Sequence, residues 1–160
     1  MTTSGEPNGH HLGADTEIDQ PADLVWSLIA DYSNDPSWRH GVTRMEPTPA
    51  GLVGKGTTTD EVMRFAGSTY QNLGEVIGIG PDLRFAWRTV KGVDADGSRS
   101  VTPLGPGRCR VRLELNVRTR GLQRVIAPIL VWLLRRNLRA DLLRLRAVAD
   151  QVAIKQRSGA

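Results

Sequence analysis

Six segments between Val42 and Arg118 have the pattern of strands, and in two of them, Leu83–Val90 and Arg108–Arg118, the side chains alternate between apolar and polar along an extended chain. Alternation puts the two kinds of side chain on opposite faces of a strand, which is typical of a sheet with one buried face and one face in water. Turn residues, including Asp94–Gly97, separate the segments. We therefore predict an antiparallel meander with strands at Val42–Pro47, Thr57–Phe65, Thr69–Ile77, Leu83–Val90, Arg99–Leu104 and Arg108–Arg118.

The last part of the chain predicts a long helix with one apolar side. On a helical wheel, its apolar residues fall within about 40° of Leu138. They are Ala127, Val131, Leu134, Leu142, Leu145, Ala149 and Val152. Because Pro128 has no amide hydrogen, we expect the regular helix to run from Pro128 to Gln151. A helix of about 36 Å can cross a whole sheet, so we predict that it covers the buried face.

The chain before the meander predicts one strand and two short helices. Ala14–Asp19 has the pattern of a short strand, Pro21 suits the first position of a helix, and a single helical turn is expected over Pro36–His40. We expect flexible tails over residues 1–13 and 154–160, which leaves one domain over residues 14–153. The first tail lacks the apolar core of a signal peptide.

Composition and charge limit the functional classes. The chain is 39% hydrophobic and 24% charged, as in ordinary soluble proteins. Its longest apolar run, Val125–Leu134, is half of the roughly 20 residues that a bilayer span needs. The single cysteine, Cys109, excludes an internal disulfide and favours a cytoplasmic location.

The net charge of +4 comes from the C-terminal segment, where nine basic and two acidic residues follow from Arg120 onward. We interpret this segment as a solvated helix face and expect no nucleic-acid partner, while peripheral contact with an anionic membrane stays open. The charge pattern does not distinguish a monomer from a homodimer.

Four short motifs, in chain order, resemble those of the START-like (SRPBCC) superfamily and its polyketide cyclase/dehydrase group. The resemblance covers residues 14 to 153. The motifs are the opening Ile18–Trp26 with Pro21 and Val25-Trp26, the continuation Asp31-Tyr32 with Pro36 and Trp38, the glycine turn Gly51–Gly56, and the closing helix motif Leu142–Arg146.

This resemblance implies an α+β helix-grip fold. A curved antiparallel sheet of about seven strands would wrap around the long C-terminal helix, with two short helices after the first strand. It also implies an internal cavity whose mouth lies near the short helices. Members of the superfamily include aromatic polyketide cyclases, lipid and sterol carriers, and binding proteins without chemistry of their own, so the fold leaves function open.

Candidate ligand-binding residues follow from the side of the sheet or helix on which each lies. Parity places Phe85 and Trp87 on the buried face, and the resemblance places Trp38 at the cavity mouth. The full predicted set is Trp38, Tyr70, Phe85, Trp87, Leu113, Leu115, Val131, Leu134 and Leu138. Arg84, Arg88, Arg110 and Arg112 are expected to face solvent.

No catalytic constellation is evident in the sequence. Asp60 and Glu61 are adjacent on a strand and point to opposite faces, His40 fits an exposed loop, and His10 and His11 lie in the expected tail. We expect no metal and no cofactor. If the chain resembles the family's cyclases, the nearest polar equivalents are Tyr32, Arg64 and Tyr70, although the sequence does not decide whether they face the cavity.

The leading hypothesis is therefore a protein that binds a small hydrophobic or polyaromatic molecule, lipid-like or polyketide-like, in an internal cavity. One alternative is a polyketide cyclase or aromatase, which requires polar side chains that converge inside the cavity. Another is an interaction module that acts through the basic C-terminal helix.

Overall fold

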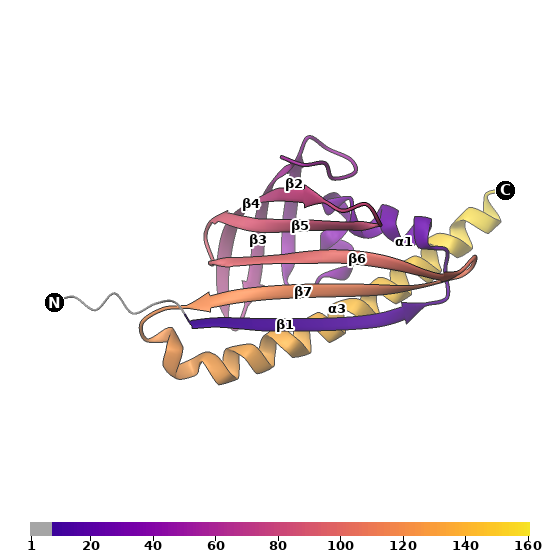
Figure 1. The fold of residues 1–160 in the computed structure, drawn as a ribbon. Helices are drawn as coiled ribbons and strands as arrows, with labels where there is room; N and C mark the ends of the chain where they lie inside the picture. Colours follow the sequence, from indigo (N-terminus) through magenta and orange to yellow (C-terminus); the bar gives the residue numbers. More distant parts are fainter. Residues whose placement is uncertain (1–7) are drawn as a thin grey trace.

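A single curved antiparallel sheet and one long helix make up most of the molecule (Figure 1). The computed structural model describes residues 8–160. Neighbouring strands follow the order β1-β7-β6-β5-β4-β3-β2, so the first strand lies beside the last. The elements are β1 Asn8–Ile18, α1 Ala22–Ile29, the 3₁₀ turn η1 Tyr32–Asn34, α2 Asp35–Trp38, β2 Val42–Thr48, β3 Thr58–Phe65, β4 Ser68–Ile79, β5 Arg84–Lys91, β6 Ala95–Gly105, β7 Arg108–Thr119 and α3 Gln123–Ser158.

This architecture confirms the predicted helix-grip fold, with seven strands, two short helices after β1, and α3 across the sheet. The predicted faces also hold. Arg84, Arg88, Arg110 and Arg112 point to solvent, each with about half of its side chain exposed. No helix within residues 8–160 combines the length and apolar character needed to cross a membrane.

β1 starts earlier than predicted. The expected tail covered residues 1–13, but residues 8–13 belong to β1, and residues 1–7 lie outside the described residues. β7 extends to Thr119, and β1 pairs with it along almost its full length, from Ile18 opposite Cys109 to Asn8 opposite Thr119. Leu12 is buried by this pairing, which gives the added residues an apolar anchor.

β6 also starts earlier, at Ala95, where the sequence predicted a turn over Asp94–Gly97. Gly97 is needed inside the strand. A Cβ at this position would lie 2.8 Å from Cζ2 of Trp87, which is paired with Gly97 across β5 and β6. The glycine therefore makes room for the indole ring of Trp87 on the inner face of the sheet.

α3 exceeds its predicted limits at both ends. It begins at Gln123 and runs through Pro128. The proline has no N–H to donate to the carbonyl of Arg124, and the helix tolerates this because water can reach that carbonyl in this exposed turn. It continues to Ser158, where a tail over 154–160 was predicted. Buried Ala153 extends the apolar side of the helix, and the positive charges of Lys155 and Arg157 suit its C-terminal end.

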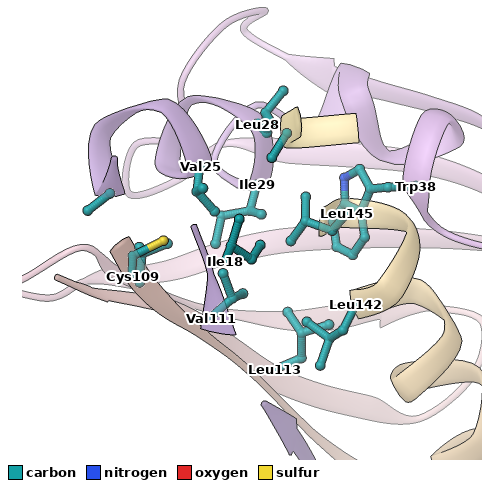
Figure 2. Close-up of a cluster of buried hydrophobic side chains, with 13 residues drawn as sticks. Ile18, Val25, Leu28, Ile29, Trp38, Cys109, Val111, Leu113, Leu142 and Leu145 are labelled. Atoms are coloured by element: carbon teal, nitrogen blue, oxygen red, sulfur yellow. The ribbon is translucent and has the colours of Figure 1, made fainter. Parts of the chain in front are cut away.

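The main core lies between the C-terminal half of α3, α1 and one end of the sheet. Figure 2 shows Leu145 next to Trp38 and Leu142 next to Leu113 in this cluster. Cys109 is buried there as well, and burial raises the pKa of its thiol, so it packs as a neutral side chain. A second cluster forms under η1 and is made of Ala30, Tyr32, Val42, Met45, Val76 and Phe85.

Burial decreases along both main elements in the same direction. On β7, Val111 is fully buried and Leu113 nearly so, whereas Leu115 and Val117 are half-buried. On the inner side of α3, Leu145 and Leu142 are buried, whereas Leu138, Leu134 and Val131 are only partly so. The end of the fold that holds the start of α3 is therefore less tightly filled than the other.

Candidate functional site

A cavity of about 610 Å³ lies between the first half of α3 and the inner face of the sheet. Its apolar wall comes from four strands and from α3. The side chains of this wall are Met45, Met63, Phe65, Trp87, Leu113, Leu115, Val117, Leu130, Val131, Leu134 and Leu138. They project from alternate positions of each strand and from one side of the helix, which is why parity on the sequence could locate most of them.

Eight of the nine predicted ligand-binding residues line this cavity: Trp38, Tyr70, Trp87, Leu113, Leu115, Val131, Leu134 and Leu138. Phe85 does not. It points to the same side of β5 as Trp87 but is fully buried, and its ring packs edge-on against Trp26 and Tyr32, with centroids 5.9 and 5.7 Å away. Phe85 therefore belongs to the packed core next to the cavity, because α1 and η1 cover this end of β5.

Trp38 lies at the inner end of the cavity. The prediction that it lies at the mouth was wrong. Only 1% of Trp38 is exposed, since α2 packs against α3 and turns the large indole inward. Solvent reaches the lining residues at two places, and we call the one at the far end from Trp38 the mouth. Of the lining residues, Gly92 in the turn before β6, and Arg120 and Gln123 at the start of α3, are exposed at the far end, and His40 is exposed beside α2.

Beside Trp38, the cavity ends on a buried ion pair between Arg99 of β6 and Asp35 of α2. The guanidinium of Arg99 donates through Nη1 and Nη2 to the two carboxylate oxygens of Asp35 at 2.8 and 2.6 Å, and it also donates to the carbonyl of Ile29 at 3.0 Å. The same group lies over the rings of Tyr32 and Trp38, 4.6 and 5.1 Å from their centroids. Arg99 thus holds α2 and η1 against the sheet.

A second arginine extends this pair across the cavity. Nη1 of Arg39 lies 3.0 Å from Asp35 and 2.6 Å from Glu61 of β3. The other oxygen of Glu61 accepts from the amide of Asn72 on β4 at 2.9 Å. We call Arg99, Asp35, Arg39, Glu61 and Asn72 the polar cluster. Both ion pairs of Arg39 run through Nη1, so its other N–H groups can donate to an oxygen in the cavity.

The electrostatics fix the charge states around the polar cluster. Burial alone would lower the pKa of Arg39, but the carboxylates of Glu61 and Asp35 outweigh burial and raise it, so the guanidinium stays charged. Burial raises the pKa of Tyr32, which keeps its phenol neutral. Burial also raises the pKa of Asp141 on α3, although its carboxylate accepts a hydrogen bond of 2.6 Å from the backbone of His40.

The sequence prediction missed the polar cluster and left open whether the three cyclase-like positions face the cavity. Tyr32 and Tyr70 line the cavity, whereas Arg64 is exposed on the outer face. Asp60 and Glu61 point to opposite faces, as predicted, with Asp60 paired to Arg44 outside. The alternation that puts Glu61 with Met63 could have placed it inside, but nothing in the sequence pairs it with Arg39.

The histidines do not form a metal site. His10 and His11 lie on β1, outside the predicted tail, because β1 begins at Asn8. His10 contacts the hydroxyl of Thr119 at 3.3 Å near the cavity mouth, and His11 contacts the side chain of Asn116 at 2.7 Å. Within residues 8–160, no three His, Cys, Asp or Glu side chains are grouped as a metal would require.

Comparison with known proteins gives one family and many similar folds. The family model described as "Polyketide cyclase / dehydrase and lipid transport" matches residues 10–150. No curated protein matches the sequence.

Three solved structures illustrate the fold. The Zhui aromatase/cyclase of Streptomyces sp. R1128 is 16% identical with a TM-score of 0.77, over 90% of this chain and 95% of that one. A START superfamily protein of Mycobacterium smegmatis is 14% identical with a TM-score of 0.75, over 89% and 99%. Norcoclaurine synthase of Thalictrum flavum, in complex with dopamine and hydroxybenzaldehyde, is 13% identical with a TM-score of 0.65, over 94% and 95%. At these identities the likeness concerns the fold.

Proposed function

The chain belongs to the family of polyketide cyclases, dehydrases and lipid-transport proteins, and from this premise we propose that it binds a small hydrophobic or polyaromatic molecule in the cavity. The observation that carries this proposal is the cavity itself, about 610 Å³ in volume, apolar along its walls and polar at its inner end. Small-molecule sites in proteins have about this volume and this division between apolar walls and few polar groups.

The proposed ligand lies with its apolar body between the sheet and α3. Trp87 and Leu115 would contact one side of it, and Leu134 and Leu138 the other. Each Å² of apolar surface removed from water contributes about 25 cal/mol before the costs of association are subtracted. This driving force is greatest for a flat, extended molecule that touches both walls.

A polar atom at one end of the ligand would fix its orientation. Arg39 has N–H groups that its ion pairs to Asp35 and Glu61 do not use, and its side chain is 23% exposed. A carbonyl or phenol oxygen suits these donors. The ligand class we propose is therefore a lipid-like or polyketide-like molecule with an oxygen at one end. The single buried cysteine leads us to propose the cytoplasm as its location.

Titration of the uncharged fluorophore N-phenylnaphthylamine into the wild type and Leu134→Trp tests the proposal. We expect saturable binding to the wild type and at least about tenfold weaker binding to Leu134→Trp, since tenfold corresponds to about 1.4 kcal/mol of lost contact. Leu143→Trp is the matched control, because Leu143 lies on the same helix but is 64% exposed. It should bind like the wild type.

Thermal melts of both variants decide between a cavity and a packed core. A ring added to a cavity should leave the melting temperature nearly unchanged, whereas overpacking would destabilise the fold by about 1–3 kcal/mol. The proposal is wrong if the wild type shows no saturable binding and Leu134→Trp shows a marked loss of stability. If the wild type binds the fluorophore, native mass spectrometry of the protein purified from its own host would identify the class of the natural ligand.

A second candidate function is cyclisation of an enolisable polyketide, as a polyketide cyclase or aromatase. The observation that favours it is that four polar side chains line the cavity from three places in the fold: Arg39 directly after α2, Glu61 on β3, and Tyr70 and Asn72 on β4. Glu61 could accept a proton while Arg39 stabilises the enolate oxygen. Incubation with a model polyketide should then give a cyclised product that Glu61→Gln does not form, while both proteins bind N-phenylnaphthylamine equally.

A further inference from the structure

The first turns of α3 expose a stripe of large apolar side chains to solvent. Between 48% and 89% of each of these residues is exposed, which is unusual for a run of aliphatic and aromatic residues on one element. The residues of this outer stripe are Leu122, Val125, Ile126, Ile129 and Trp132. In Figure 1 this part of α3, drawn in orange, runs along the edge of the sheet beside β1.

The outer stripe is one face of the helix. At 100° per residue its five members span an arc of about 120°, centred nearly opposite the arc that faces the cavity. The two arcs have separate tasks. Val131, Leu134 and Leu138 line the cavity, while Ile129 and Trp132 point away from it. The outer stripe is therefore no part of the core and no part of the cavity wall.

The chain segment that carries the outer stripe has charges of one sign, and of its arginines Arg120 is paired with Asp94 in the turn before β6. From Arg120 to Ala140 the chain holds five arginines and no aspartate or glutamate. On the wheel, Arg136 falls within the arc of the stripe, Arg139 lies about 20° from its edge, and Arg135 lies about 60° from the same edge. The guanidinium of Arg136 lies 5.7 Å from the ring centroid of Trp132. Long arginine side chains can lie along apolar surface and extend their charge to phosphate groups.

We propose that the outer stripe docks on the surface of an anionic lipid membrane, with α3 parallel to the plane of the membrane. Aliphatic side chains and a tryptophan on one face, with arginines beside them, are the features of helices that lie in the headgroup region. Residues 122–139 would provide a contact about 27 Å long. Ile129 and Val125 would enter the boundary of the acyl chains, and Arg135 and Arg139 would contact lipid phosphates.

Two other occupants fit the charges and the apolar surface less well. A second copy of the chain would bring two arginine-rich faces together without acidic partners from the same segment. A nucleic acid would use the arginines but would leave the exposed isoleucine, valine and leucine side chains without an apolar partner. A lipid surface satisfies both features.

Docking would also bring the end of the fold that holds the mouth of the cavity close to the lipid surface. Arg120 and Gln123, which border the mouth, directly precede or begin the docked turns. A lipid-like ligand could then exchange between membrane and cavity without crossing bulk water. This consequence rests on the proposed function, whereas docking itself rests on the outer stripe alone.

Flotation with lipid vesicles tests the proposal. We expect the full chain to float with vesicles of phosphatidylcholine mixed with phosphatidylglycerol, and to bind vesicles of phosphatidylcholine alone much more weakly. Ile129→Asp should weaken binding by at least about tenfold, because it puts a charge into the apolar contact. The double variant Arg135→Gln with Arg139→Gln should weaken binding by about fivefold per arginine, and added salt should remove this difference.

Val90→Asp is the matched control. Val90 on β5 is 64% exposed, close to the 63% of Ile129, and it faces solvent away from α3. It should float like the wild type. Trp132 supplies an independent signal, since its emission should shift to the blue on anionic vesicles and the shift should be absent in Trp132→Phe.

Failure of the wild type to float with the anionic vesicles would overturn the proposal, as would equal flotation of Ile129→Asp. So would sedimentation showing a wild-type dimer that Ile129→Asp separates, because a second copy would then cover the outer stripe. Binding of N-phenylnaphthylamine is measured without vesicles, so a loss of docking and a loss of cavity binding can be told apart.

Discussion

The two halves of α3 present similar leucines and valines to the sheet, but they meet different surroundings. In the C-terminal half, Leu142 and Leu145 pack against α1, Trp38 and β7 and are fully buried. In the N-terminal half, Leu134 and Leu138 face a cavity, and the opposite side of the helix is exposed and apolar. The first half is available for binding because the second half, with α1 and α2, supplies the core that the fold needs.

The largest effect on stability is expected where the packed core meets the cavity, at the ion pair between Asp35 of α2 and Arg99 of β6. Both side chains are buried, so Asp35→Ala leaves a charged guanidinium without its partner and should cost about 3–5 kcal/mol. Urea denaturation measures this. Asp60→Ala is the control, because its pair with Arg44 is exposed and worth about 1 kcal/mol or less. Equal losses in the two variants would contradict the structural role of the buried pair.

The same substitution in each half of α3 compares them directly. Leu145→Ala should lose about 2–5 kcal/mol, because it opens a void in a packed core. Leu134→Ala should lose about 1 kcal/mol or less of unfolding free energy, because the side chain of Leu134 borders a cavity and its truncation removes few packing contacts. Chemical denaturation of the two variants gives the difference, and similar losses would mean that the first half of α3 is packed as tightly as the second.

Asp141 should give a smaller effect, visible in its dependence on pH. Burial raises its pKa in the folded state, so its contribution to stability is fully present below the ordinary aspartate pKa and is lost as pH rises through the folded pKa. Asp141→Asn keeps an acceptor for the backbone of His40 without the charge. It should be at least as stable as the wild type at neutral pH, and this advantage should shrink on acidification. A constant difference across the acidic range would contradict this prediction.

Much of the fold follows from periodicity, because each strand and the helix must bury one side. The alternation in β5 and β7 and the apolar side of α3 were enough to predict the sheet and the inward faces of six lining residues, Trp87, Leu113, Leu115, Val131, Leu134 and Leu138. The first residues of β1 and β6 were missed because they are in strands only through their pairing with neighbouring strands, which the local sequence does not show. Only the length of β7 shows that Asn8 has a partner, and only the positions of the Trp87 ring and of the backbone carbonyl of Glu114 explain Gly97 inside a strand.

The cavity and its polar end could not be predicted in the same way. Leu134 and Leu145 lie on the same side of α3 and have the same chemistry, so periodicity alone cannot tell which of them meets a void. The positions of α1 and α2 decide this. The polar cluster joins Asp35 to Arg99 and Arg39 to Glu61, far apart in the chain, and it forms because α2 packs under the curved sheet.

Methyl NMR of the leucines during titration with N-phenylnaphthylamine tests most directly whether the first half of α3 covers a ligand cavity. The account predicts saturable shifts and ligand contacts at the methyl groups of Leu134 and Leu138, and no such contacts at Leu142 and Leu145. Contacts only at the exposed Leu122 and Leu143, or unchanged Leu134 and Leu138 signals at saturating fluorophore, would contradict it.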